Sequence, residues 1–197
     1  MFFRHKKNMS LSARIILIIS IRLRHSMRHI KTFIKWILLS ILIGAVTGVV
    51  GSAFNYALNN AAEMAVTNDI LLYFLPIAGI IIVFMYRGFD LKNDQGTNSI
   101  LQAARAENTS ALRVAPLVFT ATFLTHLCSG SAGREGAALQ IGGSIGSFTG
   151  RKLNLGKYDQ QVMVMCGMSA CFCSLFGTPL TAAFFAIEVA GFKGGFK

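Results

Sequence analysis

A carboxylate in an apolar, glycine-rich segment is the first feature of this sequence that could do chemistry. Glu135 follows Arg134 in the run Gly-Arg-Glu-Gly at 133–136, and residues 137–150 contain no charged side chain. An unpaired charge in apolar surroundings is costly, so it needs a partner or a function. An ion pair with Arg134 at a membrane surface is one alternative, but neighbouring side chains at a helix start diverge. Glu135 is therefore the first candidate for a functional group.

The element that positions Glu135 is predicted to be a helix that begins near residues 134–136. Gly142, Gly146 and Gly150 recur every four residues, which places them on one helix face and predicts close packing against a neighbouring helix. The first amides of a helix have no intrahelical partners and carry partial positive charge, so they bind anions. We predict an anion site at this helix start. A carboxylate there would compete with the anion and act as a gate, and its protonation would release it.

The composition predicts that these helices lie in a membrane. Hydrophobic residues make up 53% of the 197-residue chain and charged residues only 14%, whereas soluble domains average about 25% charged residues. A membrane-spanning helix needs about 20 apolar residues. Five segments of 14 residues or more lack Asp, Glu, Lys and Arg, namely 36–62, 70–86, 114–133, 137–150 and 160–187. We predict an all-α integral membrane protein, a multi-span helical bundle with broken or re-entrant helices.

The cations are concentrated at the N-terminus. Residues 1–35 hold nine Lys or Arg and no acid, and the first acidic residue is Glu63. Basic segments beside a first span indicate the cytoplasmic side, so we expect a basic cytoplasmic N-terminus and no binding of nucleic acid, despite the net charge of +11. Residues 1–26 leave two alternatives open. They form an amphipathic helix on the inner membrane surface, or they precede a true initiator at Met27.

The remaining chain is predicted to form one membrane domain at 36–190. Spans are expected at about 36–60, 70–86, 111–129 and 160–176, with a half-membrane helix within 94–108 and a short helix at 180–190 after a break at 177–179. Gly44, Gly48 and Gly51 are expected to allow close helix contact in the first span. Residues 191–197 form an atypical tail that suggests truncation or a frameshift. Neither a cofactor, a metal nor an enzymatic reaction is expected, because no motif for one has supporting context.

Three motifs resemble those of the CLC family of anion channels and anion/proton antiporters. The run at 133–136, followed by Gln140, resembles that family's GREGPxVQ motif, and Glu135 matches its gating glutamate. The run Gly-Thr-Asn-Ser-Ile at 96–100 falls where the family has GSGIP. The segment 176–189 resembles the family's NAPLAGxLFxxEE segment, and Glu188 matches its first glutamate. Val189 stands at the second glutamate. This departure, together with the altered GSGIP run, resembles the fluoride-exporting branch or an uncharacterised bacterial branch more than the chloride antiporters.

The resemblance implies a set of site residues and a fold. The gate and proton carrier would be Glu135, and Glu188 would lie along the ion path. The anion would be bound by residues of two helix starts, namely Gly96, Thr97, Gly133, Arg134, Gly136 and Gln140. The fold would be the N-terminal half of the inverted-repeat architecture of the CLC family, which a complete protein forms as a homodimer.

The implied function is transport of an inorganic anion, chloride or fluoride, across the inner or plasma membrane, by a channel or by proton-coupled exchange. Only the first of the family's two repeats has a counterpart in this chain. The alternative is therefore a truncated or frameshifted fragment that does not transport, or a half-subunit that needs a partner.

Overall fold

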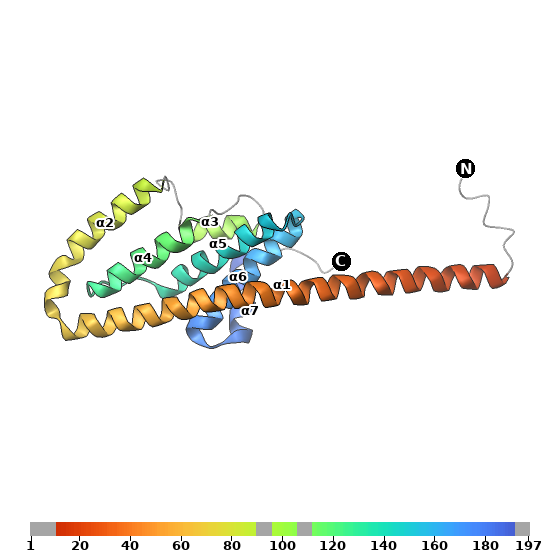
Figure 1. Cartoon of the computed structure of the whole chain (residues 1–197), viewed down its shortest axis with the longest axis horizontal. Coiled ribbons are helices and arrows are strands. Elements are labelled where there is room, and N and C mark those ends of the chain that lie inside the picture. Colours follow the sequence, from red (N-terminus) through yellow and green to blue (C-terminus); the bar gives the residue numbers. More distant parts are fainter. Residues whose placement is uncertain (1–10, 90–95, 106–111, 192–197) are drawn as a thin grey trace. The chain divides into compact units, whose positions relative to one another are not determined.

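The computed structural model describes residues 11–89, 96–105 and 112–191, with side chains in the first helix described from residue 30 (Figure 1). These residues form seven α-helices, one 3-10 helix and no strand, which confirms the predicted all-α class. In chain order the elements are α1 (Leu11–Thr67), η1 (Asp69–Phe74), α2 (Leu75–Gly88), α3 (Thr97–Ala104), α4 (Val114–Leu127), α5 (Arg134–Lys152), α6 (Lys157–Phe176) and α7 (Pro179–Ala190).

The chain divides into two compact units between Ile41 and Leu42, within α1. The first unit holds the N-terminal part of α1, which is helical from Leu11 onward, so the basic segment continues into the first predicted span as helix. The second unit holds the rest of α1 and all other elements, and every contact described below lies within it.

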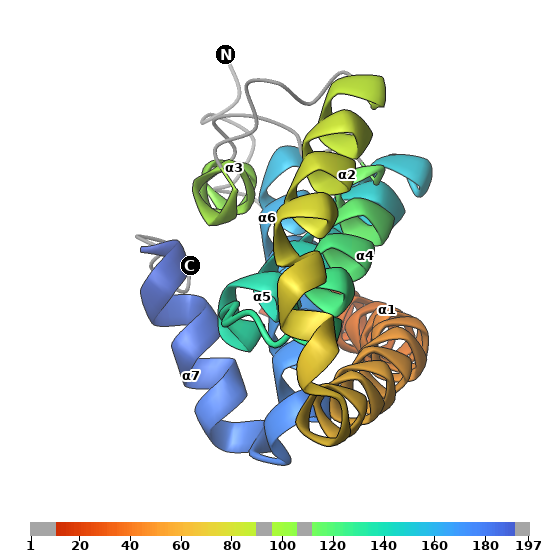
Figure 2. The ribbon, with the colours of Figure 1, turned by 90° about the vertical axis from the view of Figure 1, so that its left-hand side faces the viewer.

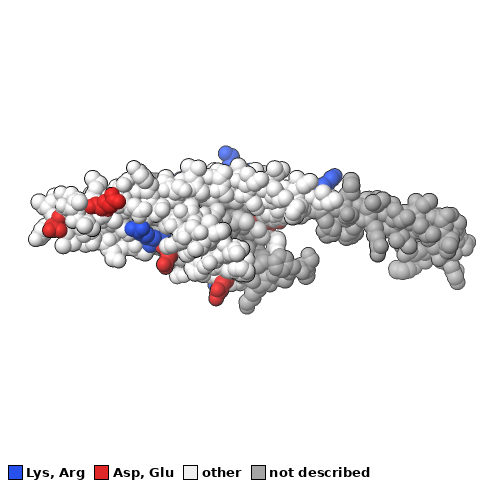
Figure 3. Space-filling view, turned by 90° about the horizontal axis from the view of Figure 1, so that it is seen from below, with Lys and Arg blue, Asp and Glu red and all other residues white. Residues whose placement is uncertain are grey.

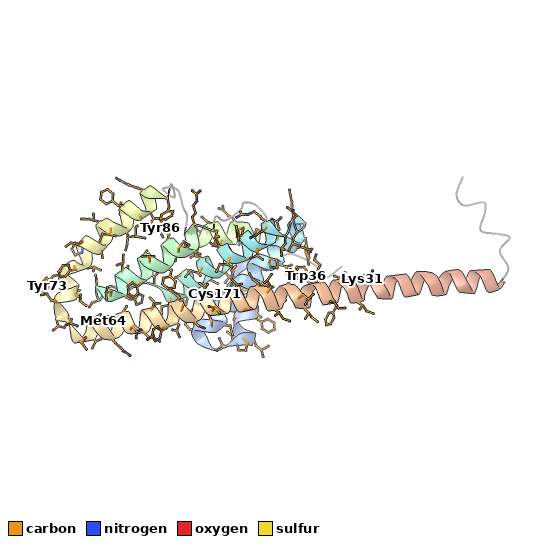
Figure 4. All side chains as sticks on the ribbon, in the orientation of Figure 1. Lys31, Trp36, Met64, Tyr73, Tyr86 and Cys171 are labelled. Atoms are coloured by element: carbon orange, nitrogen blue, oxygen red, sulfur yellow. The ribbon has the colours of Figure 1, made fainter. Side chains whose placement is uncertain are left out.

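Two stretches of helix are long and apolar enough to cross a bilayer, Ile30–Thr67 and Asp69–Gly88. Their exposed side chains are largely apolar, and one face of the described residues carries only scattered charges (Figure 3). Tyr73 lies in η1 and Tyr86 near the end of α2 (Figure 4), positions that suit the two interfacial aromatic belts of a membrane protein.

The predicted span at 111–129 is shorter than expected. Helix α4 covers 14 residues, or about 21 Å at 1.5 Å per residue, which is less than the roughly 30 Å of a hydrocarbon core. The helix ends at Leu127 because Ser129 adopts a left-handed backbone with φ 59°. The length of the apolar run overestimates the length of α4, because the run continues through the turn that ends the helix.

Helix α5 occupies the centre of the second unit, with α7 and α4 on either side and α6 behind it in Figure 2. The buried core joins four helices, α3, α5, α6 and α7, through the side chains of Ile100, Ala103, Ala104, Leu139, Val164, Met165, Met168, Ala186 and Ala190. The buried core residues that α7 supplies are small, so α7 lies close to its neighbouring helices.

The predicted glycine face of α5 is confirmed, and its partner is α6. A Cβ atom at Gly142 would collide with the carbonyl oxygen of Gly167, and one at Gly146 would collide with that of Met163. At Gly150 it would lie 3.3 Å from the Cγ of Gln160. The two backbones therefore approach closely along two turns, as small-residue contacts in membranes allow.

The same prediction for α1 is wrong at two of three positions. A Cβ at Gly44 or Gly48 would meet no atom of the described residues within 4 Å, whereas one at Gly51 would collide with the side chain of Ser174 in α6. In this part of the chain, only Gly51 of the three therefore marks a close helix contact. The spacing of the three glycines could not show this, because it defines a face without naming what lies opposite.

Candidate anion site

The starts of α3 and α5 meet, although they are almost 40 residues apart in the sequence. A Cβ added at Gly136, in the first turn of α5, would lie 3.1 Å from the Oγ1 of Thr97, the first residue of α3. One turn further along α5, the Nε2 of Gln140 donates a hydrogen bond to the same oxygen over 3.3 Å. Thr97, Gly136 and Gln140 therefore form one cluster.

Gly96 directs the chain into α3 through a backbone conformation that residues with a side chain rarely adopt. Its φ is 61° and its ψ is −129°, a region that glycine enters without steric cost. A Cβ there would lie 4.0 Å from the Nε2 of Gln140. Gly96 thus belongs to the same cluster, and its conformation sets the direction in which α3 begins.

Neither helix start has a side-chain cap. Gly96 precedes α3 and Gly133 precedes α5, and neither helix makes a side-chain hydrogen bond at its N-cap. Apart from the N–H of Ser99, which donates to the carbonyl oxygen of Gly96, the first amides of both helices thus remain available to another acceptor within the described residues. Each helix start also carries roughly half a positive charge, so two starts in contact favour an anion more than one does.

Gln140 leaves a polar atom unsatisfied beside these helix starts. Its Oε1 is buried and has no hydrogen-bond partner among the described residues, while its Nε2 donates to Thr97. Because the Thr97 hydroxyl oxygen accepts this bond, its own proton stays free to be donated to a further group. The side chain of Gln140 therefore orients a hydroxyl donor at the junction of α3 and α5.

Arg134 and Glu135 have different surroundings. The Nη1 of Arg134 donates to the Oδ1 of Asn59 in α1 over 3.2 Å. Glu135 lies in the first turn of α5 and is exposed, and no ion pair joins it to Arg134 in the part of the chain that the structure describes. The ion-pair alternative for Glu135 thus finds no support. Asn59 is a partner of Arg134 that the sequence motifs did not predict, although a pair of amides late in an apolar span is an available signal.

Glu188 is not part of this cluster. It is exposed in the last turn of α7, and it lies near the opposite end of α3, where the Nε of Arg105 donates to the carbonyl oxygen of Ala190 over 3.0 Å. Thr97 and Arg105 are separated by about 12 Å along a helix. The structure therefore groups four of the eight predicted site residues, Gly96, Thr97, Gly136 and Gln140. It places Gly133, Arg134 and Glu135 at the start of the same helix α5, and it leaves Glu188 apart.

Comparison with known proteins gives three findings. Residues 78–194 match the family model for the voltage gated chloride channel. A chloride/fluoride channel protein of Pseudomonas syringae pv. tomato (strain ATCC BAA-871 / DC3000) is 35% identical over 133 residues, which are 67% of this chain and 29% of that protein. A crystal structure of a CLC-type fluoride/proton antiporter superposes with a TM-score of 0.72 at 37% identity, over 77% of this chain and 38% of the other.

A more distant structure shows the fold alone. A slow cyanobacterial Cl−/H+ antiporter superposes with a TM-score of 0.58 at 22% identity, over 78% of this chain and 44% of that protein. The chain thus spans about a third of the length of the curated relative and less than half of each solved structure.

Proposed function

Because the chain belongs to the voltage gated chloride channel family, we propose that it serves the transport of a small inorganic anion across a membrane, with the anion held at the joined starts of α3 and α5. The observation that supports this proposal most directly is the cluster of Thr97, Gly136 and Gln140. It combines uncapped amides from two helices with an oriented hydroxyl group. Such an arrangement replaces the water around an anion without a cationic side chain in contact.

In this proposal Glu135 is the gate and the proton carrier. Its carboxylate lies on the first turn of α5, where it competes with the anion for the same amides. Protonation removes the negative charge and with it the attraction to the helix start. Anion entry and proton uptake at this residue are therefore coupled, and Arg134, held by Asn59, raises the local potential without neutralising Glu135.

Fluoride is the proposed substrate in preference to chloride. The CLC-type fluoride/proton antiporter and the chloride/fluoride channel protein are both more similar to this chain than the Cl−/H+ antiporter is. A small, strongly hydrated anion also gains most from closely spaced N–H and O–H donors. Val189, in place of a second glutamate after Glu188, agrees with a proton route that differs from that of the chloride exchangers.

The proposed setting is a multi-pass protein of the inner or plasma membrane with a cytoplasmic N-terminus. The nine cations of residues 1–35 favour this orientation. Helix α1 then runs outward, η1 and α2 form the return, and α5 ends with Arg151 and Lys152 on the cytoplasmic side.

A second proposal concerns how much protein is needed for transport. The chain covers 38% of the fluoride/proton antiporter, so a functional pore would require further protein, either more of the same polypeptide or a partner chain. In that case the described site is half of an anion pathway, and this chain alone would not conduct.

An efflux assay separates these proposals. The purified chain is reconstituted in liposomes loaded with fluoride or chloride, and the released anion is followed with ion-selective electrodes. Release of fluoride above protein-free liposomes, and above release of chloride, supports transport by the chain. Equal release of both anions contradicts the fluoride preference. No release contradicts transport by the chain alone and supports the half-site proposal.

The hydroxyl group oriented by Gln140 leads to a first prediction. Replacing Gln140 by leucine removes a hydrogen bond to Thr97 that contributes about 0.5–1.5 kcal/mol, so we expect fluoride efflux to fall by roughly twofold to tenfold. Gln140→Glu replaces the Nε2 donor by an oxygen acceptor, which would draw the Thr97 hydroxyl proton away from the anion, so it should not rescue efflux. The matched control is Gln161→Leu on α6, since that half-buried glutamine lies outside the cluster. Unchanged efflux in Gln140→Leu would contradict the orienting role.

A further inference from the structure

A groove on the second unit lies away from the anion cluster. It has a volume of about 870 Å³, within the range of small-molecule sites, and it is lined by α1, α4, the C-terminal half of α5 and the residue that follows α2. On α1 the lining residues are Leu42, Val46 and Val50, which recur every four residues along one face. The floor from α4 and α5 includes Phe119 and Ile145. The groove is apolar along most of its length.

The charged residues of the groove lie at one end. Arg113, immediately before α4, and Lys152, the last residue of α5, both line it. Both side chains are exposed, and the Nζ of Lys152 lies 5.8 Å from the ring centroid of Phe148, which also lines the groove. Helix α4 begins at the same end, but its first turn offers few free donors, because the N–H of Ala115 donates to the carbonyl oxygen of Leu112 and Pro116 has no N–H. The positive charge at this end therefore comes from the two cations.

The direction of the groove matches the proposed direction of the membrane. Leu42 and Val50 are about 12 Å apart along α1, so the groove runs along the helix and not across it. With the N-terminus in the cytoplasm, its cationic end faces the inner leaflet surface and its apolar part extends toward the bilayer centre. An amphiphile with an anionic head and an apolar chain has this distribution.

We propose that this groove binds an anionic phospholipid of the inner leaflet. The phosphate lies between Arg113 and Lys152, and an acyl chain lies along Leu42, Val46 and Val50. Basic pockets between membrane helices on the cytoplasmic side hold anionic headgroups in this way, and the inner leaflet supplies them. The site is independent of the proposed transport activity, although it contacts α5, whose first turn forms the anion cluster.

Native mass spectrometry of the detergent-solubilised chain tests this site with two probes, phosphatidylglycerol and phosphatidylcholine with identical acyl chains. Each cation near an anionic headgroup contributes about fivefold to binding, so we expect a preference for phosphatidylglycerol of roughly 25-fold. The double variant R113Q/K152Q should remove the preference. The matched control R87Q/K157Q, which changes two exposed cations outside the groove, should keep it.

A third variant tests the apolar part. Thr120 lines the groove, and Thr120→Trp fills it while leaving both cations in place, so the bound amount of each lipid should fall. The proposal is overturned if R113Q/K152Q keeps the preference, if R87Q/K157Q loses it equally, or if Thr120→Trp binds as the unchanged chain does. The chain could instead form dimers that exclude lipid and that Thr120→Trp prevents. That result would identify a second copy of the chain as the occupant of the groove and would also overturn the proposal.

Discussion

Replacing Glu135 by alanine is expected to abolish the pH dependence of anion efflux and any coupled proton movement. The variant has no carboxylate at the start of α5 to compete with the anion, so the site stays accessible at every pH. We expect anion release at neutral pH to match or exceed that of the unchanged chain at acidic pH. Fluoride release and internal pH would be followed together in liposomes at acidic and neutral pH.

The reason for this large effect lies in the surroundings of Glu135. It is exposed on the first turn of α5, and the nearby cation Arg134 is bonded to Asn59. Within the described residues no ion pair holds the carboxylate, so the helix start is its principal electrostatic partner. In the proposed mechanism, protonation of Glu135 would therefore act directly on the occupancy of the anion site.

A matched control distinguishes a gate from a general loss of charge. Glu63 is an exposed carboxylate near the end of α1, outside the cluster. We expect Glu63→Ala to retain pH-dependent release, and Glu135→Gln to behave like Glu135→Ala because glutamine does not titrate. Persistence of pH dependence and proton coupling in Glu135→Ala would rule out Glu135 as the gate. If the chain alone releases no anion, both measurements would be made on the longer protein or the complex that contains this chain.

The second large effect is expected at Gly146, where leucine should prevent α5 from packing against α6. A Cβ at this position would collide with the carbonyl oxygen of Met163 and would lie 3.0 Å from the Cα of Val164. These atoms belong to backbone, so they cannot move aside as a flexible side chain does. Inserting side-chain atoms into a packed core costs about 1–3 kcal/mol, and we expect the upper end of this range or more.

The measurement is thermal unfolding in detergent, with size-exclusion chromatography as a second readout. Gly146→Leu should unfold at a lower temperature or elute as aggregate. Gly48→Leu is the matched control, because a Cβ there meets no atom of the described residues within 4 Å. Leucine is also a better helix former than glycine by about 0.8 kcal/mol, so this control should be neutral or slightly stabilising. Equal behaviour of the two variants would contradict the close α5–α6 contact.

Several features of the fold could be predicted from the sequence because they depend on neighbouring residues. Low charge and long apolar runs indicate membrane helices, and glycines at 142, 146 and 150 define one face of a helix whatever lies opposite. The start of α5 after Gly133 follows from the glycines around Glu135 and the apolar run behind them. The anion role of Thr97, in contrast, came from a family resemblance and not from its spacing.

Other features depend on contacts between distant segments, and only the tertiary structure decided them. Gly44 and Gly48 have the same spacing as the α5 glycines but face open space, since no helix lies opposite them in the described residues. The hydrogen bond between Gln140 and Thr97 likewise requires that two helix starts meet.

The groove that has Arg113 and Lys152 at one end is the clearest example of a feature that the sequence alone could not predict. Each cation lies beside the end of a different helix, 39 residues from the other in the sequence, and the sequence predicts only that each terminates a helix at the membrane surface. Helix formation is decided by local backbone hydrogen bonds and side-chain pattern, so the sequence alone determined the elements and the start of α5. Which helix ends come together is decided by packing summed over the whole chain, and for this protein the tertiary structure supplied that answer.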